Sequence, residues 1–202
     1  MLTPLPFEPG VAGVDEAGRG PIAGPLVVAA VMLPSRFDTF GLDDSKRLTR
    51  GERELQFDRI VAGAEYAIIT VPTEEVDRVN ILRATLNAMS QALRDLPGHA
   101  YRAVIDGNQY PIDPPCPCDL IVKGDSHRAE IAAASILAKV TRDRLMVAAA
   151  ETYPGYGFDT HFGYHRPDHI EALERLGPCP LHRRSFEPIK TMVNQPCLIF
   201  GD

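Results

Sequence analysis

The sequence predicts an α/β protein in which a mixed β-sheet is flanked by helices, with a helical C-terminal portion. Three short runs of Val, Ile and Leu close at an acid or a glycine, which is typical of strands. Longer segments repeat apolar residues at helical spacing. The chain has 202 residues, 45% of them hydrophobic, which is enough for one core. A single domain spanning residues 1–202 is therefore expected.

The three strand-like runs bring carboxylates to strand ends. The first run stops near residue 16, the second covers 102–106, and the third covers 119–123 with an acid two residues later. In open α/β sheets the ligand crevice lies at the ends of the strands. We therefore expect four carboxylates to lie together. They belong to Asp15, Glu16, Asp106 and Asp125.

Such a cluster predicts a bound cation, because like charges repel and raise one another's pKa. Oxygen ligands without an evident His or Cys partner favour Mg²⁺ or Mn²⁺ over zinc. Successive residues in a strand face opposite ways, so Asp15 and Glu16 share an ion only if the strand breaks there, and Gly18 is expected to provide that break. A turn or a solvated cap is the alternative for each acid, and for Asp106 the two interpretations weigh equally.

The remaining elements follow from periodicity and end signals. A Thr49–Glu52 capping box precedes a helix, and the alanine-rich segment is expected to pack on the sheet, with Ser135 in a structural role. We predict helices at 50–62, 81–96, 128–153 and 167–176, a strand at 65–71, a catalytic core at about 10–155, a helical portion at about 160–190 and a loose tail at 191–202.

Six motifs, taken in order, carry a resemblance to a known family. They are Asp15-Glu-Ala-Gly-Arg-Gly20, Asp44-Ser-Lys-Arg-Leu48, Ile105-Asp-Gly-Asn108, Val122-Lys-Gly-Asp125, Ala133-Ala-Ser-Ile-Leu-Ala-Lys-Val-Thr-Arg-Asp143 and His182-Arg-Arg-Ser-Phe186. Together they resemble bacterial ribonuclease HII from about Gly13 to Lys190. The resemblance implies a ribonuclease H-like fold and an endoribonuclease that cuts the RNA strand of RNA/DNA hybrids. It also implies cutting 5′ to ribonucleotides embedded in duplex DNA, by two-metal-ion catalysis that leaves 3′-OH and 5′-phosphate ends.

The resemblance assigns roles to individual residues. The four carboxylates become catalytic metal ligands, and the glycine-flanked arginine segment reads the RNA-to-DNA junction, where the 2′-OH is the distinguishing group. A tyrosine stacks on the neighbouring sugar, although Phe162 stands where relatives often carry a lysine. The expected substrate-binding residues are Gly18, Arg19, Gly20, Ser45, Lys46, Tyr164, Arg183 and Arg184. His127 is a weaker phosphate candidate, Asp143 is at least as suited to ion pairs, and His161 and His165 are expected to be satisfied polar groups.

The net charge of the chain is negative, but its distribution still allows a nucleic-acid partner. The net charge is −6, but four acids are proposed metal ligands, and basic residues gather in two segments near 139–144 and 182–190. No apolar stretch reaches the length of a membrane span, and no secretory signal is evident. We expect a cytoplasmic monomer with free thiols at its four cysteines, no membrane partner, and RNA/DNA hybrids or ribonucleotide-containing duplex DNA as substrates.

Two other functional classes remain open from the sequence. One is a DNA nuclease or integrase-like enzyme with the same acidic site and no need for ribose. The Gly18-Arg19-Gly20 segment argues against it. The other is a nucleic-acid-binding module that has lost activity, for which a substituted carboxylate would be expected. None of the four is substituted.

Overall fold

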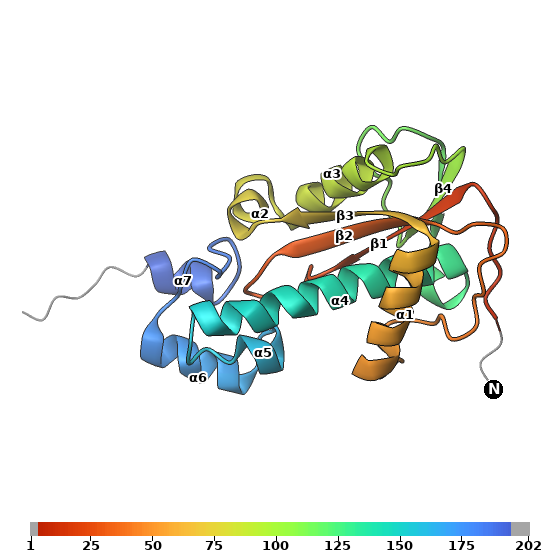
Figure 1. Ribbon diagram of the computed structural model, residues 1–202. Coiled ribbons are helices and arrows are strands. Elements are labelled where there is room, and N and C mark those ends of the chain that lie inside the picture. The colour runs from red at the N-terminus through yellow and green to blue at the C-terminus, as the bar shows by residue number, and fades with distance from the viewer. Residues whose placement is uncertain (1–3, 195–202) are drawn as a thin grey trace, which may run out of the picture.

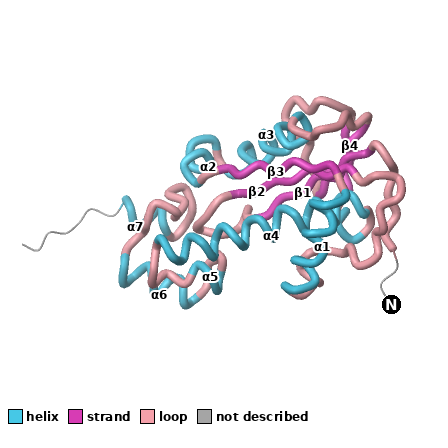
Figure 2. The backbone as a smooth tube through the Cα atoms, in the orientation of Figure 1, coloured by secondary structure: helices cyan, strands magenta, loops and turns pink. Residues whose placement is uncertain are grey.

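A five-stranded mixed sheet forms the centre of the computed structural model, which describes residues 4–194. The strands are β1 (Val11–Ala17), β2 (Leu26–Met32), β3 (Glu65–Val71), β4 (Arg102–Asp106) and β5 (Cys118–Ile121), in the spatial order β3-β2-β1-β4-β5. β1 pairs antiparallel with β2 and parallel with β4; β2–β3 is antiparallel and β4–β5 is parallel. The strands lie between the helices (Figure 2). The predicted α/β class is confirmed.

Helices cover both faces of this sheet and gather at one end of it (Figure 1). They are α1 (Arg50–Gly63), α2 (Thr73–Val79), α3 (Ile81–Arg94), α4 (Ala129–Thr152), α5 (Phe158–His161), α6 (Pro167–Leu176) and α7 (Ile189–Asn194), with a 3₁₀ turn at Gly124–Ser126. On one face Val14 and Val28 pack with Met89 of α3. On the other, Val27 and Ala29 pack with the alanine-rich α4.

The helix α4 lies unusually close to β1, and Gly13 makes this possible. A Cβ at Gly13 would lie 2.1 Å from the carbonyl carbon of Glu130 in α4. The alanine side chains of α4 are small, so the helix packs closely against the sheet. This contact places the middle of α4 over the end of β1, where Asp15 and Glu16 lie.

Most predicted helices form close to the expected bounds. The Thr49–Glu52 capping box is present at the start of α1, with the Thr49 side chain accepting from the Glu52 N–H. α6 has the predicted bounds, with Pro167 in its first turn and Gly177 as its C-cap. Local chemistry decides these helix ends, so they are readable without the tertiary structure.

Several expectations about elements are wrong. The sequence interpretation assigned neither β2 nor α2, and β5 ends at Ile121, so that Asp125 lies in a 3₁₀ turn instead of directly after a strand. The predicted loose tail begins inside α7, which continues to Asn194; residues 195–202 lie outside the described residues. Apolar runs buried on both faces lack the alternation that marks a strand, which explains the missed β2.

Gly18 ends the strand as expected, with β1 stopping at Ala17 and a φ of +98° at Gly18, but Asp15 and Glu16 themselves lie within the regular strand. Both residues remain paired with β2, opposite Ala29 and Val28, and β1 ends only at Ala17. The pairing with β4 does stop earlier, at Val14. The acid pair therefore has a strand neighbour on the β2 side only. On the β4 side, Asp15 lies beyond the last paired residue.

Two general expectations concern membranes and thiols. Within residues 4–194 no helix has the length and apolar content needed to cross a membrane. Cys116, Cys118 and Cys179 are free, as predicted. Cys197 lies outside the described residues.

Candidate active site

Two of the predicted carboxylates lie at the ends of neighbouring parallel strands. Val14 of β1 is in register with Ile105 of β4, so Asp15 and Asp106 are the next residues on two neighbouring strands. The Gly124 N–H donates to Oδ1 of Asp106 at 2.7 Å, which ties the turn that carries Asp125 to the end of β4. The strand-end interpretation of Asp106 thus agrees with its position.

Electrostatics shows how closely these acids interact. Burial raises the pKa of Asp15 well above its usual range, and the charges of Glu16 and Asp106 raise it further. Burial also raises the pKa of Glu16, although the neighbouring Arg19 guanidinium opposes the shift. Burial, together with the charges of Asp44 and Asp106, raises the pKa of Asp125 to about 6. The site therefore holds more negative charge than its surroundings compensate.

The residues fit a divalent cation on these grounds. Mutual repulsion of buried carboxylates is relieved by a bound cation, and oxygen donors suit Mg²⁺ and Mn²⁺. In the part of the chain that the structure describes, no three Asp, Glu, His or Cys side chains form a ready-made metal-binding group. The acids are thus close enough to shift one another's pKa, but their side chains do not meet at one point.

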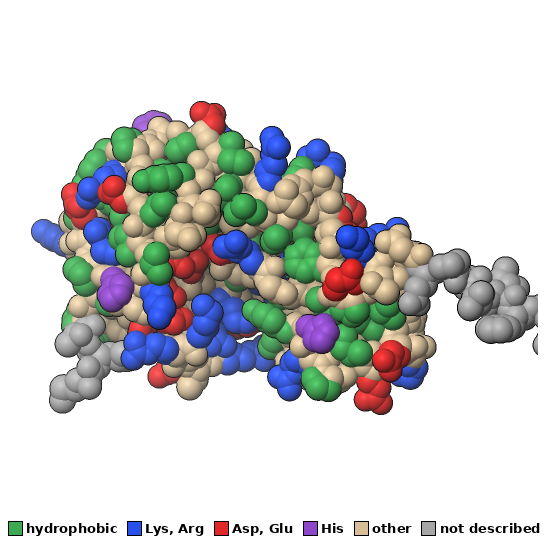
Figure 3. All heavy atoms as spheres, turned by 180° about the vertical axis from the view of Figure 1, so that it is seen from behind, with side chains coloured by type: hydrophobic (Ala, Val, Ile, Leu, Met, Phe, Trp, Pro, Cys, Tyr) green, Lys and Arg blue, Asp and Glu red, His purple; other side chains and the backbone are tan. Residues whose placement is uncertain are grey.

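A cleft of about 390 Å³ opens beside the acids. It is lined by Asp15, Glu16, Ala17, Gly18, Arg19, Gly20, Ser45, Lys46, Ser135, Lys139 and Tyr164. Figure 3 shows acidic side chains in a hollow near the middle of one face, with Lys and Arg side chains beside them. The cleft therefore brings two of the four predicted carboxylates, those of Asp15 and Glu16, together with most of the predicted substrate-binding residues. Its lining does not include Asp106, Asp125, Arg183 or Arg184.

The segment after the acid pair turns sharply at Gly18. Its φ is +98°, which favours glycine, and a Cβ there would lie 2.2 Å from Nε of Arg142. Gly20 differs, because a Cβ there would meet no atom within 4 Å. Arg19 directs its guanidinium back to Oε1 of Glu16 at 3.3 Å. Packing within the protein thus requires glycine at residue 18 but not at residue 20.

Comparison with known proteins decides the family. The family model described as Ribonuclease HII matches residues 12–189. This chain belongs to the ribonuclease HII family. Enzymes of this family are endoribonucleases that act on RNA/DNA hybrids.

Individual relatives agree with this assignment. The chain is 49% identical to ribonuclease HII of Parvibaculum lavamentivorans, covering 91% of this chain and 68% of that protein. It is 52% identical to ribonuclease HII of Nitrobacter winogradskyi, covering 89% and 69%. Among solved structures, ribonuclease H2 from Pyrococcus horikoshii superposes with a TM-score of 0.76 at 29% identity, covering 90% of this chain and 96% of that one. RNase HII in a complex with PCNA from Archaeoglobus fulgidus superposes with a TM-score of 0.71 at 27% identity, covering 88% and 95%.

Two serines from separate ribonuclease HII motifs contact each other at the cleft. The hydroxyl groups of Ser45 and Ser135 lie 2.9 Å apart, and Ser135 also donates to the Asp15 carboxylate, which lowers the pKa of Asp15 against the larger effect of burial. The structural role predicted for Ser135 is thus incomplete. Ser135, Lys139 and Asp143 recur every four residues, which is the signal that they share one helix face. The sequence analysis likewise gave no role to Asp44, whose charge raises the pKa of Asp125.

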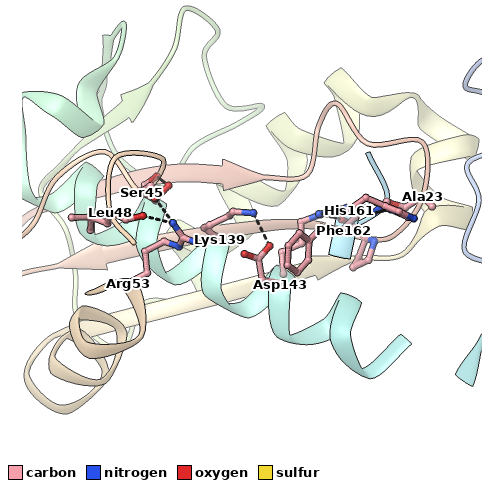
Figure 4. Close-up of polar contacts among 12 residues, drawn as sticks. Ala23, Ser45, Leu48, Arg53, Lys139, Asp143, His161 and Phe162 are labelled. Carbon is pink, nitrogen blue, oxygen red and sulfur yellow. Dashed lines mark hydrogen bonds and ion pairs between the residues drawn. The ribbon is translucent and has the colours of Figure 1, made fainter. Parts of the chain in front are cut away.

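The loop that carries Ser45 and Lys46 is fixed from behind by α1. Nη1 of Arg53 donates to the carbonyls of Ser45 and Leu48 at 2.9 and 2.6 Å (Figure 4). Lys46 is left exposed at the cleft. Burial lowers the pKa of Lys46, but the surrounding carboxylates, first Asp44, raise it overall. Lys46 is therefore an exposed cation at the edge of the cleft.

The first basic segment does not form the exposed patch that we expected. Arg142 is buried, and Arg144 pairs with Glu54. Lys139 donates to Asp143 at 2.7 Å and lies 5.1 Å from the ring centre of Phe162 (Figure 4). The ion-pair interpretation of Asp143 is confirmed, although its partner is Lys139 and not one of the flanking arginines.

The second basic segment also needs correction. His182 and Arg183 are buried, and the Arg183 guanidinium binds backbone carbonyls instead of facing the cleft. Arg184 is exposed, and its backbone N–H donates to Asp77. The two adjacent arginines, one buried and one exposed, look alike in the sequence, which gives no sign of this difference.

The histidines of the C-terminal portion are structural in their contacts. His161 is buried and has partners at both ring nitrogens, as predicted, whereas His165 and the phosphate candidate His127 are exposed. His169, which the sequence interpretation did not single out, contacts the carbonyl of Tyr164 at 2.9 Å. The aromatic ring of Tyr164 is 44% exposed at the cleft.

Proposed function

We propose that this ribonuclease HII cuts on the 5′ side of a ribonucleotide embedded in duplex DNA, as well as within RNA/DNA hybrids, leaving 3′-OH and 5′-phosphate ends. The observation that carries the proposal is the shared cleft, in which the buried Asp15 and the partly buried Glu16 adjoin the open backbone at Gly20. Hydrolysis and recognition of one sugar therefore take place side by side.

The four carboxylates are proposed to hold two divalent ions, Mg²⁺ or Mn²⁺. Asp15 and Asp106, at the ends of neighbouring strands, are the candidates for contact with both ions. Glu16 would hold one of them, and Asp125 would complete the other or assist product release. When bound, such ions supply an activated water and offset the charge on the leaving 3′ oxygen.

Side chains around the acids orient the nucleic acid. Lys46 is cationic and exposed, so it is suited to a backbone phosphate. The exposed ring of Tyr164 is suited to stacking on the sugar next to the cut. Arg184 is exposed and is proposed as a further phosphate contact. None of these groups is arranged to read base edges, so cleavage should have little sequence preference.

Recognition of ribose is proposed to come from the backbone of residues 18–20. The 2′-OH is the group that separates ribose from deoxyribose. Because nothing lies within 4 Å of a Cβ built on Gly20, a sugar is able to approach the backbone there. This is the feature that favours a ribonuclease over a ribose-independent DNA nuclease.

The experiment is cleavage of an end-labelled DNA duplex that carries one ribonucleotide, with Mg²⁺ or Mn²⁺. An all-DNA duplex and an Asp106→Asn variant serve as controls. One cut 5′ to the ribonucleotide, absent from the control duplex and lost in the variant, is expected. Equal cutting of both duplexes would contradict ribose recognition, and binding without cutting would favour the inactive-module alternative.

The location and assembly of the protein stay predictions. We propose a cytoplasmic monomer, because nothing in the described residues requires a second chain to complete the cleft. Light scattering at micromolar concentration tests the monomer directly.

A further inference from the structure

Two arginines of the family motifs, Arg142 and Arg183, are the largest fully buried side chains of the described residues, at 1% and 0% exposure. Within residues 4–194 neither forms an ion pair with a carboxylate. Burying an unpaired guanidinium is costly, and here burial lowers the pKa of Arg183 to about 9 and also lowers that of Arg142. Each side chain instead donates to backbone carbonyls.

These carbonyls belong to the segment that follows the catalytic acids. Arg183 reaches the carbonyls of Gly18, Arg19, Pro21 and Gly24 at 2.6 to 3.2 Å. Arg142 reaches those of Ala23, Pro25 and Phe162 at 2.9 to 3.0 Å. The two guanidinium groups thus join the ribose-reading segment to the loop that carries Tyr164.

The carbonyl contacts determine where the amide groups face. In a trans peptide the C=O and N–H point in opposite directions. Because Arg183 draws the carbonyls of Gly18 and Arg19 inward, the N–H groups of Arg19 and Gly20 face outward. Among residues 4–194 neither N–H has an acceptor. Two unused donors are therefore presented on the side of the segment that lines the cleft.

We propose that Arg183, assisted by Arg142, is a positioning residue that sets the register of the ribose-reading backbone relative to the scissile phosphate. This inference rests on the proposed function. The arginines do not touch substrate in this arrangement; they hold the Arg19 and Gly20 amides in one orientation. Lysine keeps the charge but carries its three donors on one nitrogen instead of a planar fork, so it does not span the four carbonyls that Arg183 reaches.

The two substrate types respond differently to a loosened segment. In a continuous hybrid every sugar of the RNA strand is a ribose, so an amide that has shifted still meets a 2′-OH. In a DNA duplex with one ribonucleotide, a single register is productive. Loss of positioning should therefore reduce cutting of the single-ribonucleotide duplex more than cutting of the hybrid.

The test compares wild type with Arg183→Lys and Arg142→Lys on both substrates. We expect kcat/KM for the single-ribonucleotide duplex, divided by that for the hybrid, to fall about tenfold or more. The Mn²⁺-dependent rise in Tm should persist, since the carboxylates are unchanged. Arg59→Gln is the matched control, because Arg59 also donates to backbone carbonyls, those of Asp38 and Phe40, away from the cleft.

Each other outcome overturns the proposal. An equal loss on both substrates would make the arginines general supports of the fold, and an unchanged ratio would remove them from recognition. Failure of both lysine variants to fold would likewise assign them to overall stability. Failure of the proposed function is recognised separately, because wild type would then cut the hybrid but not the single-ribonucleotide duplex.

Discussion

At the scale of single residues, two glycines that closely follow the acid pair have different reasons to be glycine. Gly18 has a positive φ and packs against Arg142, whereas Gly20 faces open space. Substitution at residue 18 would therefore disturb the fold. Substitution at residue 20 would leave the fold unchanged, so it tests the approach of substrate separately from stability.

The Gly20→Ala variant is expected to fold with an unchanged Tm and to lose about tenfold or more in kcat/KM on a single-ribonucleotide duplex, because the methyl group would occupy the space of the sugar. Thermal unfolding and steady-state cleavage measure the two effects. Gly51→Ala is the control, since a Cβ there also meets open space. Full activity of Gly20→Ala would show that the sugar does not approach this backbone.

Asp15 is the acid that burial and neighbouring charges disturb most. In EDTA, Asp15→Asn should raise Tm by a few degrees, about 1 kcal/mol, because it removes a repelled buried charge. The same variant should lose cleavage by at least about 100-fold and show no Mn²⁺-dependent rise in Tm. A lower Tm in EDTA would mean that the Asp15 carboxylate stabilises the metal-free fold.

At the scale of elements, the contact between α4 and β1 brings the residues of the cleft on these two elements together. Gly13→Ala would place a methyl group 2.1 Å from the Glu130 carbonyl carbon, so α4 must move away from β1. We expect a loss of about 2 kcal/mol or more in the free energy of unfolding. Urea denaturation measures it, and Gly51→Ala, at the start of α1, should show little change.

The same displacement should reduce activity in the protein that remains folded. Ser135 on α4 donates to Asp15 on β1, and the two groups separate if the helix moves. Cleavage measured well below Tm tests this coupling. Wild-type kcat in a destabilised Gly13→Ala variant would show that the helix contact serves stability alone.

At the scale of the whole molecule, acid should weaken the C-terminal portion. Nε2 of His169 lies 3.0 Å from Nε2 of His182, and burial lowers the pKa of each to about 4. The unfolded chain, with a pKa near 6.5, therefore binds more protons between pH 6.5 and 4. Stability is complete above pH 6.5 and falls as the pH drops through this window.

Urea denaturation in EDTA at pH 7 and pH 5 measures this effect. The loss of stability between the two values should be about 2 kcal/mol greater in wild type than in His169→Gln. The comparison is necessary because Asp125, with a pKa raised to about 6, contributes the opposite sign and is present in both proteins. Identical pH dependence in the two proteins would show that the imidazole pair is not held neutral.

The extent to which the sequence predicted the molecule differs between its parts. The capping residues Thr49 and Pro167 and the strand-end acid Asp106 were identified correctly, because each signal is contained in a few neighbouring residues. The fully apolar β2 was missed, since burial on both faces removes alternation. Arg183 was assigned to phosphate contact, because adjacent arginines look alike until packing separates them.

The sequence by itself determined the ribonuclease HII family and the α/β class, since ordered motifs and short apolar runs are local patterns, and it predicted the set of acids. Only the tertiary structure decided that Ser135 meets Asp15 and that Arg142 and Arg183 lie beneath residues 18–25. These contacts join segments more than 100 residues apart. They depend on how closely α4 and the C-terminal portion pack on β1, which is a property of the assembled core.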